Sequence, residues 1–384
     1  MGTTTANQNQ EPKRSFRERF LSPLVIPLLA IFSSLVIVAI VIIITSDGLG
    51  DGLNKVAIGY WGIIDGALLR PSGLVNTLVA TAPLILTGLA VAIPFHAGLF
   101  NIGGEGQFMM GALFGAVVGI YVDLPPVIHI IAVILAGVLG GMLWGAIPGV
   151  LKAWLGSHEV INTIMLNFIA IALVNMLVRN VMKDPNPSTV QTLPLLETAQ
   201  LARIPFPGVA SSRLHLGFFI AVLVAVLAWY FLFKTTWGFS LRTTGLNPDA
   251  AEYAGIRPKR EYILSFLIAG GLAGMAGIME VQGLSRVLPV GFDAGYGFTA
   301  IAVSLLALNN PLAIIPGAMI FGLLTVGGDF LQIRAGLSVH IVSIFRALIL
   351  LFVAAPEIVR YIYRMRGEPE KAEAMPAPQT RWGS

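Results

Sequence analysis

The residues best suited to bind a solute lie in one short stretch, residues 95–107, where amides and a carboxylate alternate with glycines. Its second half contains the polar and glycine residues Asn101, Gly103, Gly104, Glu105, Gly106 and Gln107. The glycines disfavour a continuous helix, and irregular backbone at membrane depth is tolerated where it is buried in protein or lines a cavity. We expect a broken or re-entrant helix whose amides and N–H groups face a polar solute. The alternative is a tight cytoplasmic turn with a solvated Glu105.

A second interruption, residues 291–299, precedes a short apolar segment that stops at Asn309. Paired interruptions in the two halves of a transporter mark the solute path. In the segment that starts near residue 160, Thr163 and Asn167 are four residues apart and share a helix face, where they either bind neighbouring helices or face a cavity. The predicted solute-pathway residues are Asn101, Gly103, Gly104, Glu105, Gln107, Thr163, Asn167, Phe298 and Thr299.

The sequence lacks the usual arrangements of catalytic residues. It has no G-x-x-x-x-G-K-[ST] loop for binding ATP, no H-E-x-x-H zinc motif and no nucleophile elbow. It also has no cysteine, and its five histidines are scattered. We therefore predict that the chain is not an enzyme, that it holds no metal or cofactor, and that any ATP hydrolysis is performed by a separate protein.

The elements that must position these residues are long apolar segments. Hydrophobic residues make up 56% of the 384 positions and charged residues 11%, whereas a soluble domain carries about 25% charged residues. About 20 apolar residues span a bilayer as a helix. Ten apolar segments lie near 24–45, 75–95, 107–122, 127–151, 160–178, 215–233, 261–282, 297–309, 311–327 and 339–355. We predict an all-α integral membrane protein, a polytopic bundle of about 8–10 transmembrane helices with broken or re-entrant segments.

The distribution of basic residues predicts the orientation of the chain. With the N-terminus inside, 15 of the 24 Lys and Arg residues fall on the interior side and 8 on the exterior side, so both termini are predicted to be cytoplasmic. This bias, rather than nucleic-acid binding, explains the net charge of +4. The predicted parts are a basic cytoplasmic N-terminus (1–23), a transmembrane domain (24–356) with an exterior loop (179–214) and a cytoplasmic loop (234–260), and a disordered cytoplasmic tail (357–384).

Two segments carry glycines at helical spacing, which predicts close helix packing. Gly137, Gly141, Gly145 and Gly149 recur every four residues and so lie on one helix face, where another backbone can approach closely. The segment 261–282 contains a second set, formed by Gly270, Gly271, Gly274 and Gly277. We interpret both as interior packing faces.

The cytoplasmic loop contains a short helix with its own caps. Asn247 is a good N-cap, Pro248 suits the first helical position, and Gly255 suits the C-terminal cap. A capped helix on the positive side of a membrane protein is a way for a cytoplasmic ATPase to hold it; the alternative is a surface turn. The predicted coupling residues are Gly245, Asn247, Pro248, Ala250, Ala251, Glu252, Ala254 and Gly255.

At these residues the sequence resembles the permease subunits of bacterial ABC importers, in the branch that serves branched-chain amino acids, simple sugars and nucleosides. The capped helix in residues 245–256 looks like the coupling loop of that branch. Its nucleoside-type members are most similar at residues 100–107, 158–167, 297–303 and 309–312.

The resemblance implies the partners, the location and the cargo. The partners would be a cytoplasmic ABC ATPase, a second permease subunit in a heterodimer and an extracellular solute-binding lipoprotein. The chain would lie in a bacterial cell (inner) membrane, in contact with membrane lipid. Its cargo would be a small neutral polar solute, a nucleoside or alternatively a simple sugar. An ion-coupled secondary carrier, for which Glu105 or Glu280 would bind the ion, is the competing class.

Overall fold

The computed structural model describes residues 22–185, 189–292 and 295–363. The helices are α2 (Ser22–Ile44), α3 (Leu49–Ile64), α4 (Pro71–His96), α5 (Gly104–Tyr121), α6 (Pro126–Leu155), α7 (Glu159–Asn180), α8 (Gly217–Lys234), α9 (Thr236–Leu246), α10 (Pro248–Tyr253), α11 (Pro258–Glu280), α12 (Tyr296–Leu306), α13 (Pro311–Ala335), α14 (Val339–Ala354) and α15 (Pro356–Ile362). Within the described residues, six helices are long and apolar enough to cross a membrane, and three apolar stretches are shorter. The prediction of an all-α polytopic membrane protein is confirmed.

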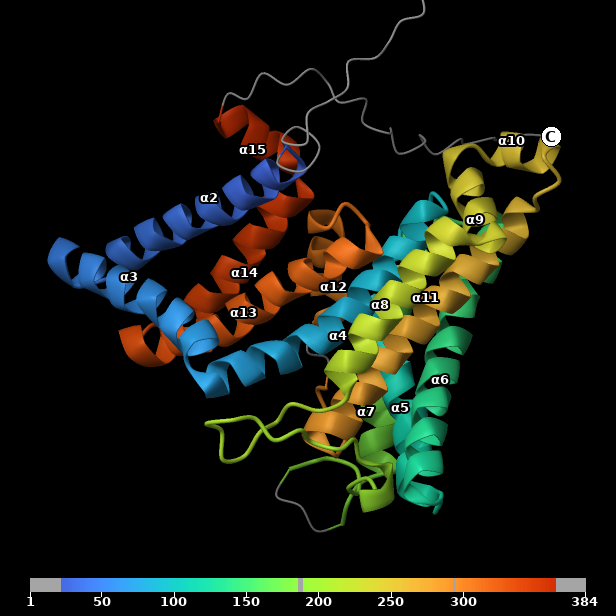
Figure 1. The fold of residues 1–384 in the computed structure, drawn as a ribbon, viewed down its shortest axis with the longest axis horizontal. Coiled ribbons are helices and arrows are strands. Elements are labelled where there is room, and N and C mark those ends of the chain that lie inside the picture. Colours follow the sequence, from blue (N-terminus) through green and yellow to red (C-terminus); the bar gives the residue numbers. More distant parts are fainter. Residues whose placement is uncertain (1–21, 186–188, 293–294, 364–384) are drawn as a thin grey trace, which may run out of the picture.

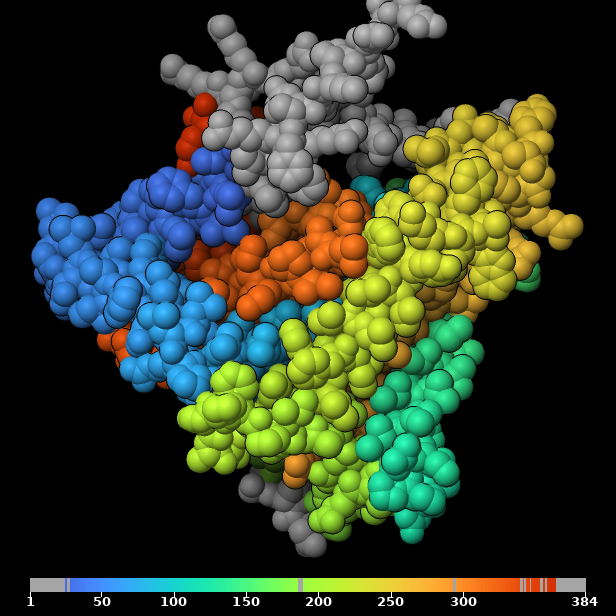
Figure 2. All heavy atoms as spheres, viewed as in Figure 1, coloured from blue at the N-terminus to red at the C-terminus, as the bar shows by residue number. Residues whose placement is uncertain are grey.

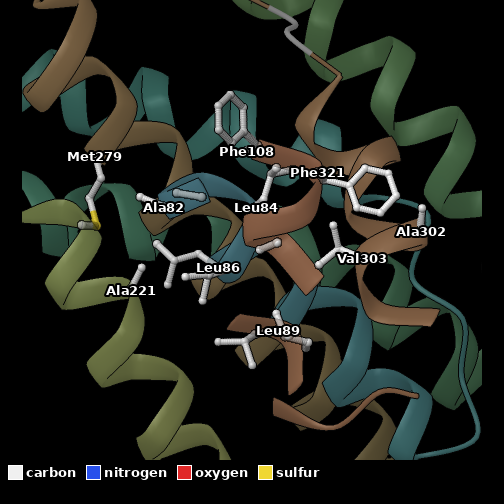
Figure 3. Close-up of a cluster of buried hydrophobic side chains, with 14 of the residues drawn as sticks. Ala82, Leu84, Leu86, Leu89, Phe108, Ala221, Met279, Ala302, Val303 and Phe321 are labelled. Carbon is white, nitrogen blue, oxygen red and sulfur yellow. The ribbon is translucent and has the colours of Figure 1, made fainter. Parts of the chain in front are cut away.

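Helix α4 is the centre of the bundle. In the most apolar 18-residue stretch of α4, 83% of the residues are buried inside the protein. The corresponding share is 28% in α6, 22% in α7 and 28% in α8. Helices with such exposed apolar faces suit a lipid environment, whereas α4 is enclosed by protein. Figure 3 shows side chains of α4 among those of the surrounding helices, with Leu84, Leu86 and Leu89 labelled beside Phe108, Ala221, Met279, Val303 and Phe321.

The predicted glycine faces of α6 and α11 pack against each other. A Cβ atom on Gly141 would lie 2.0 Å from the carbonyl oxygen of Gly270, and one on Gly274 would lie 2.4 Å from that of Gly137. The two backbones therefore approach as closely as small-residue helix pairs in membranes do. The interpretation of both sets as interior packing faces is confirmed.

The stretch between the first two predicted spans is helical, which the sequence did not lead us to expect. Residues 46–74 fall between the apolar segments 24–45 and 75–95, but α3 occupies most of them and packs on α13 through Gly59 and Gly62. Asp51, Asn54 and Lys55 lower the hydropathy of this helix, so a search for long apolar runs misses it. Its end is fixed by Asp65, which pairs with Arg334 at 2.6 Å and with Arg70 at 3.0 Å.

The proline-rich segment 179–214 and the helices α9 and α10 lie at opposite ends of the molecule (Figure 1). In the described part of that segment the one helical turn is η2 (Glu197–Ala199). The space-filling view shows α8 running between these two ends across one face, between α6 on one side and α12 and α13 on the other (Figure 2). The arrangement fits the predicted assignment of the two loops to opposite sides of the membrane.

The chain termini are only partly described. The basic segment and the tail lie outside the described residues at 1–21 and 364–384. The tail was predicted to be disordered from residue 357, and this is wrong at its start, because α15 is a helix. Pro356 stands at the first turn of α15, where the missing proline N–H costs no hydrogen bond.

Candidate functional site

The first sequence break is a turn that folds back into the bundle. After α4 ends at His96, the amide nitrogen of Asn101 donates to the carbonyl of Ala90 at 3.1 Å and to Gln107 Oε1 at 3.0 Å. Gln107 Nε2 returns a hydrogen bond to Asn101 Oδ1 at 3.2 Å, and the N–H of Gly103 donates to the same oxygen at 3.0 Å. The returning chain therefore lies against the last turns of α4, and α5 begins inside the protein.

The two breaks meet at Glu105. Its carboxylate accepts the N–H of Gly297 at 2.7 Å and the N–H of Gly295 at 3.0 Å, and only 1% of the residue is exposed. These N–H groups lie at the start of α12, where a negative charge is stabilised by the helix dipole. A Cβ atom on Gly297 would lie 2.1 Å from the backbone nitrogen of Glu105. The glycines of the second break thus allow the start of α5 to touch the start of α12.

Helix α7 holds the same turn from the other side. Asn167 Oδ1 accepts the N–H of Gly106 at 2.8 Å, and Asn167 Nδ2 donates to the carbonyl of Ile102 at 2.9 Å. Thr163 is buried against Gly103, but its hydroxyl donates within its own helix to the carbonyl of Glu159 at 2.8 Å. Asn167 is therefore the residue of α7 that binds the turn, and Thr163 fills space beside it.

The far end of α12 is held by a residue that the sequence prediction did not include. His96 Nε2 lies 3.1 Å from the carbonyl oxygen of Asn309, and Ser304 donates to Asn309 Oδ1 at 2.9 Å. Asn309 has a left-handed backbone with φ of 57°, which asparagine tolerates better than most residues. His96 and Glu105 flank one turn and hold the two ends of one short helix. Position next to the break was the only signal for His96.

The polar groups of this cluster are bonded to the chain itself. We expected the amides of Asn101 and Gln107 and the N–H groups of the turn to face a solute, but in this structure they pair with one another and with backbone groups. A buried polar group without a partner costs about 1–3 kcal/mol, so internal pairing is favoured. Contact of these residues with a solute stays a prediction.

Two predicted pathway residues lie at the edge of this cluster. Phe298 is 39% exposed, and the hydroxyl of Thr299 donates to the carbonyl of Gly295 at 2.9 Å within the first turn of α12. The Phe298 side chain has no hydrogen-bonding group, and within the described residues the Thr299 hydroxyl bonds at the start of α12 and not to the α4–α5 turn. The structure therefore gathers Asn101, Gly103, Gly104, Glu105, Gln107, Thr163 and Asn167 and leaves these two at the margin.

The capped helix of the cytoplasmic loop forms as α10. Asn247 Oδ1 accepts the N–H of Ala250 at 3.0 Å, and Gly255 has φ of 82°, as a C-terminal glycine cap requires. The helix has six residues, Pro248–Tyr253. Ala250, Glu252 and Ala254 are exposed.

Of the alanines in this helix (Ala250 and Ala251) and at its C-cap (Ala254), one faces inward. Ala251 is buried within the chain, so our expectation that it would touch a partner is wrong for its side chain. Its burial follows from helical geometry, because one face of a short helix must rest on the helices from which it projects. Contact of Ala250 and Ala254 with a partner stays a prediction.

The end of α4 connects the predicted coupling residues, within 245–255, to the polar cluster around Glu105. A Cβ atom on Gly245 would lie 2.2 Å from the carbonyl oxygen of His96, and one on Gly98 would lie 3.1 Å from the carbonyl oxygen of Gly245. Gly98 also has φ of 74°, which favours glycine. The chain just before α10 thus rests on the turn that leads to Asn101 and Glu105.

Helix ends that meet inside an all-α membrane bundle are a feature that transporters use. Residues 73–354 match the family described as branched-chain amino acid transport system / permease component. The chain belongs to this family.

Three relatives support the assignment. A guanosine ABC transporter permease protein of Bacillus subtilis is 38% identical, over 89% of this chain and 96% of the relative. A nucleoside ABC transporter permease protein of Lactococcus lactis is 34% identical, over 87% and 91%. A glucose ABC transporter permease protein of Haloferax volcanii is 33% identical, over 81% and 84%. The chain is an ABC permease subunit, a transport component and not an enzyme, and its ATPase is carried by a separate subunit.

Proposed function

We propose that this chain forms part of the translocation pathway of an ATP-driven importer for nucleosides. The observation that carries the proposal is the 38% identity to a guanosine permease over nearly the whole of both chains. The interior agrees with a neutral cargo, because both carboxylate oxygens of Glu105 already accept N–H groups at the start of α12. A simple sugar is the second candidate, favoured by the similarity to the glucose permease.

The proposal includes the other components of such a system. The family description names a permease as one component of a transport system, so we infer a second permease subunit in a heterodimer, cytoplasmic ABC ATPases and an extracellular solute-binding lipoprotein. The assembly lies in the bacterial inner membrane. Both termini of this chain are cytoplasmic, which the distribution of Lys and Arg supports.

Helix α10 is the proposed contact with the ATPase. It is exposed at one end of the molecule, and Tyr253 at its end is 94% exposed. A groove of about 1050 Å³ beside it is lined by Asp249 and Glu252 of α10 and by basic residues that include Arg257 and Lys259. Such a charged edge suits a polar protein surface.

Motion of α10 has a physical route to the interior. Gly245 rests on the end of α4, and the turn after α4 holds both ends of α12 through His96 and Glu105. Closure of the ATPases would move this end of α4 and thereby shift α12 relative to α5. The pathway would open alternately to each side in this way.

Reconstitution with the partner subunits tests the proposal. Proteoliposomes containing the complete transporter should accumulate radiolabelled guanosine only with ATP and binding protein, and uptake should persist when ion gradients are collapsed. Excess unlabelled glucose should not compete. Uptake driven by an ion gradient without the ATPase would overturn the importer, and transport of sugar with no transport of any nucleoside would favour the second candidate.

A further inference from the structure

A cavity of about 300 Å³ lies beside the polar cluster, between α4, α12, α13 and the chain that precedes α8. Its polar and aromatic lining consists of Asn76, Arg213, Tyr296, Thr325, Asp329 and Phe330. Asn76 stands in the first turns of α4 and Asp329 near the end of α13, and Arg213 belongs to the proline-rich exterior segment. In the proposed orientation the cavity therefore lies at the exterior end of the bundle.

The lining suits a neutral molecule with a ring and several hydroxyl groups. Small-molecule sites have volumes of roughly 300–1,000 Å³ and combine apolar walls with a few placed polar groups. Tyr296 and Phe330 offer aromatic surface, and Asn76 and Thr325 offer an amide and a hydroxyl. Arg213 and Asp329 bring opposite charges, so the cavity does not favour an anion or a cation as a whole.

One wall of the cavity is fixed by close packing. A Cβ atom on Gly66 would lie 2.2 Å from Phe330 Cγ, so the ring of Phe330 rests directly on the backbone at Gly66. Packing this tight keeps a side chain in one position. The aromatic surface of Phe330 is therefore already placed before a ligand arrives.

The cavity touches the polar cluster through Tyr296. The Tyr296 hydroxyl lies 3.4 Å from Glu280 Oε1, and the ring centroid lies 5.6 Å from that of Phe108 on α5. Tyr296 is the first residue of α12 and stands between the two glycines whose N–H groups bind Glu105. A molecule that contacts Tyr296 would thus contact the end of α12 that Glu105 holds.

We propose that this cavity is an outer solute site, in which a nucleoside released by the binding protein is held before it passes α12. The site rests on the proposed function, since it takes its ligand class from it. The nucleobase packs on the rings of Tyr296 and Phe330. The amide of Asn76 and the hydroxyl of Thr325 bind polar groups of the nucleoside.

The test uses the complete transporter in proteoliposomes and measures the KM for guanosine uptake together with basal ATP hydrolysis. Thr325→Val keeps the shape of the side chain and removes its hydroxyl, so the KM should rise roughly 3- to 10-fold, as expected for one lost hydrogen bond. Asn76→Leu should act in the same direction. The matched control is Thr87→Val, because the Thr87 hydroxyl donates to Pro83 within α4 and does not line the cavity; its KM should stay at the wild-type value.

A cavity-filling variant gives a second readout. Ala80 lines the cavity, so Ala80→Leu should abolish most uptake while the assembled complex retains basal ATP hydrolysis. Unchanged KM values in Thr325→Val and Asn76→Leu, with normal uptake by Ala80→Leu, would overturn the outer site even though the wild type imports guanosine. Failure of the wild type to import any nucleoside would instead overturn the proposed function.

Discussion

Two regions of this protein are rich in glycine, and they use it differently. Between α6 and α11, glycines lie within continuous helices and let two backbones approach along several turns, as at Gly141 and Gly270. Around Glu105, glycines lie at the start of a helix, and the N–H groups of Gly295 and Gly297 donate to the Glu105 carboxylate. The first region is a long contact repeated turn after turn, and the second is a single point held by a carboxylate.

The difference indicates which part of the bundle moves as a unit. A packed pair of helices resists displacement because every turn contributes contacts. A helix such as α12, held at its ends by His96 and Glu105, can change position by exchanging a few hydrogen bonds. We infer that α6 and α11 form the fixed frame and that α12 is the element whose shift opens the pathway.

The largest expected effect is a loss of stability when the packing of α6 on α11 is disrupted. In Gly141→Ala the new Cβ would lie 2.0 Å from the carbonyl oxygen of Gly270. Because that oxygen is a backbone atom, the clash is relieved only if one of the two helices shifts. Overpacking of this kind costs about 1–3 kcal/mol, so the purified protein should unfold at a lower temperature in detergent. The control is Gly50→Ala, where nothing lies within 4 Å. Equal melting temperatures for the two variants would contradict the tight packing of α6 on α11.

A slightly smaller effect on stability, but a loss of transport, is expected at the junction of α5 and α12. Gly297→Ala would place a Cβ 2.1 Å from the backbone nitrogen of Glu105, whereas Gly104→Ala would place one at 3.4 Å from Gly297 Cα, an ordinary contact. Guanosine uptake should be lost in the first variant and nearly normal in the second. Similar uptake by both would show that the approach of α5 to α12 is not required.

The charge of Glu105 provides the next test. Glu105→Gln keeps the shape but removes the charge and one of the two acceptors for the N–H groups of α12, and charge-assisted hydrogen bonds contribute about 1.5–3 kcal/mol. We expect uptake to fall about tenfold with normal insertion into the membrane, as measured in vesicles. Glu197→Gln, an exposed change in the exterior segment, should have no effect. Full activity of Glu105→Gln would mean that α12 does not depend on the carboxylate.

The sequence predicts the elements of this comparison better than their contacts. Glycine spacing predicts the packing faces of α6 and α11, and Gly103, Gly104 and Gly106 predict the break after α4, because both signals are local. The contact of Glu105 with Gly295 and Gly297 spans 190 and 192 residues, and no spacing rule predicts a pairing over that distance. The hydrogen bond from Gly106 to Asn167 is hidden in the same way.

Two further errors have physical causes. Helix α3 was missed because its charged and amide residues interrupt the apolar pattern, although it packs on α13. Ala251 was assigned to a partner contact because alanine occurs on both buried and exposed helix faces, so the residue type does not predict which face it occupies. Only the structure shows that its side chain is buried while Ala250 and Ala254 are exposed.

The smallest expected effect concerns a glycine that no neighbour touches. Gly255 has φ of 82° and nothing lies within 4 Å of a Cβ built on it, so within this chain any effect of substitution comes from the backbone. A residue with a side chain pays roughly 1–2 kcal/mol in a left-handed conformation, and a β-branched residue tolerates it least. Gly255→Val should therefore loosen the end of α10 and lower solute-stimulated ATP hydrolysis of the assembled complex about two- to fivefold. Gly255→Asn should stay near the wild-type rate, because asparagine adopts this conformation readily. If both variants hydrolyse ATP at the wild-type stimulated rate, the cap of α10 does not contribute to coupling, and glycine at this position serves only to turn the chain towards α11.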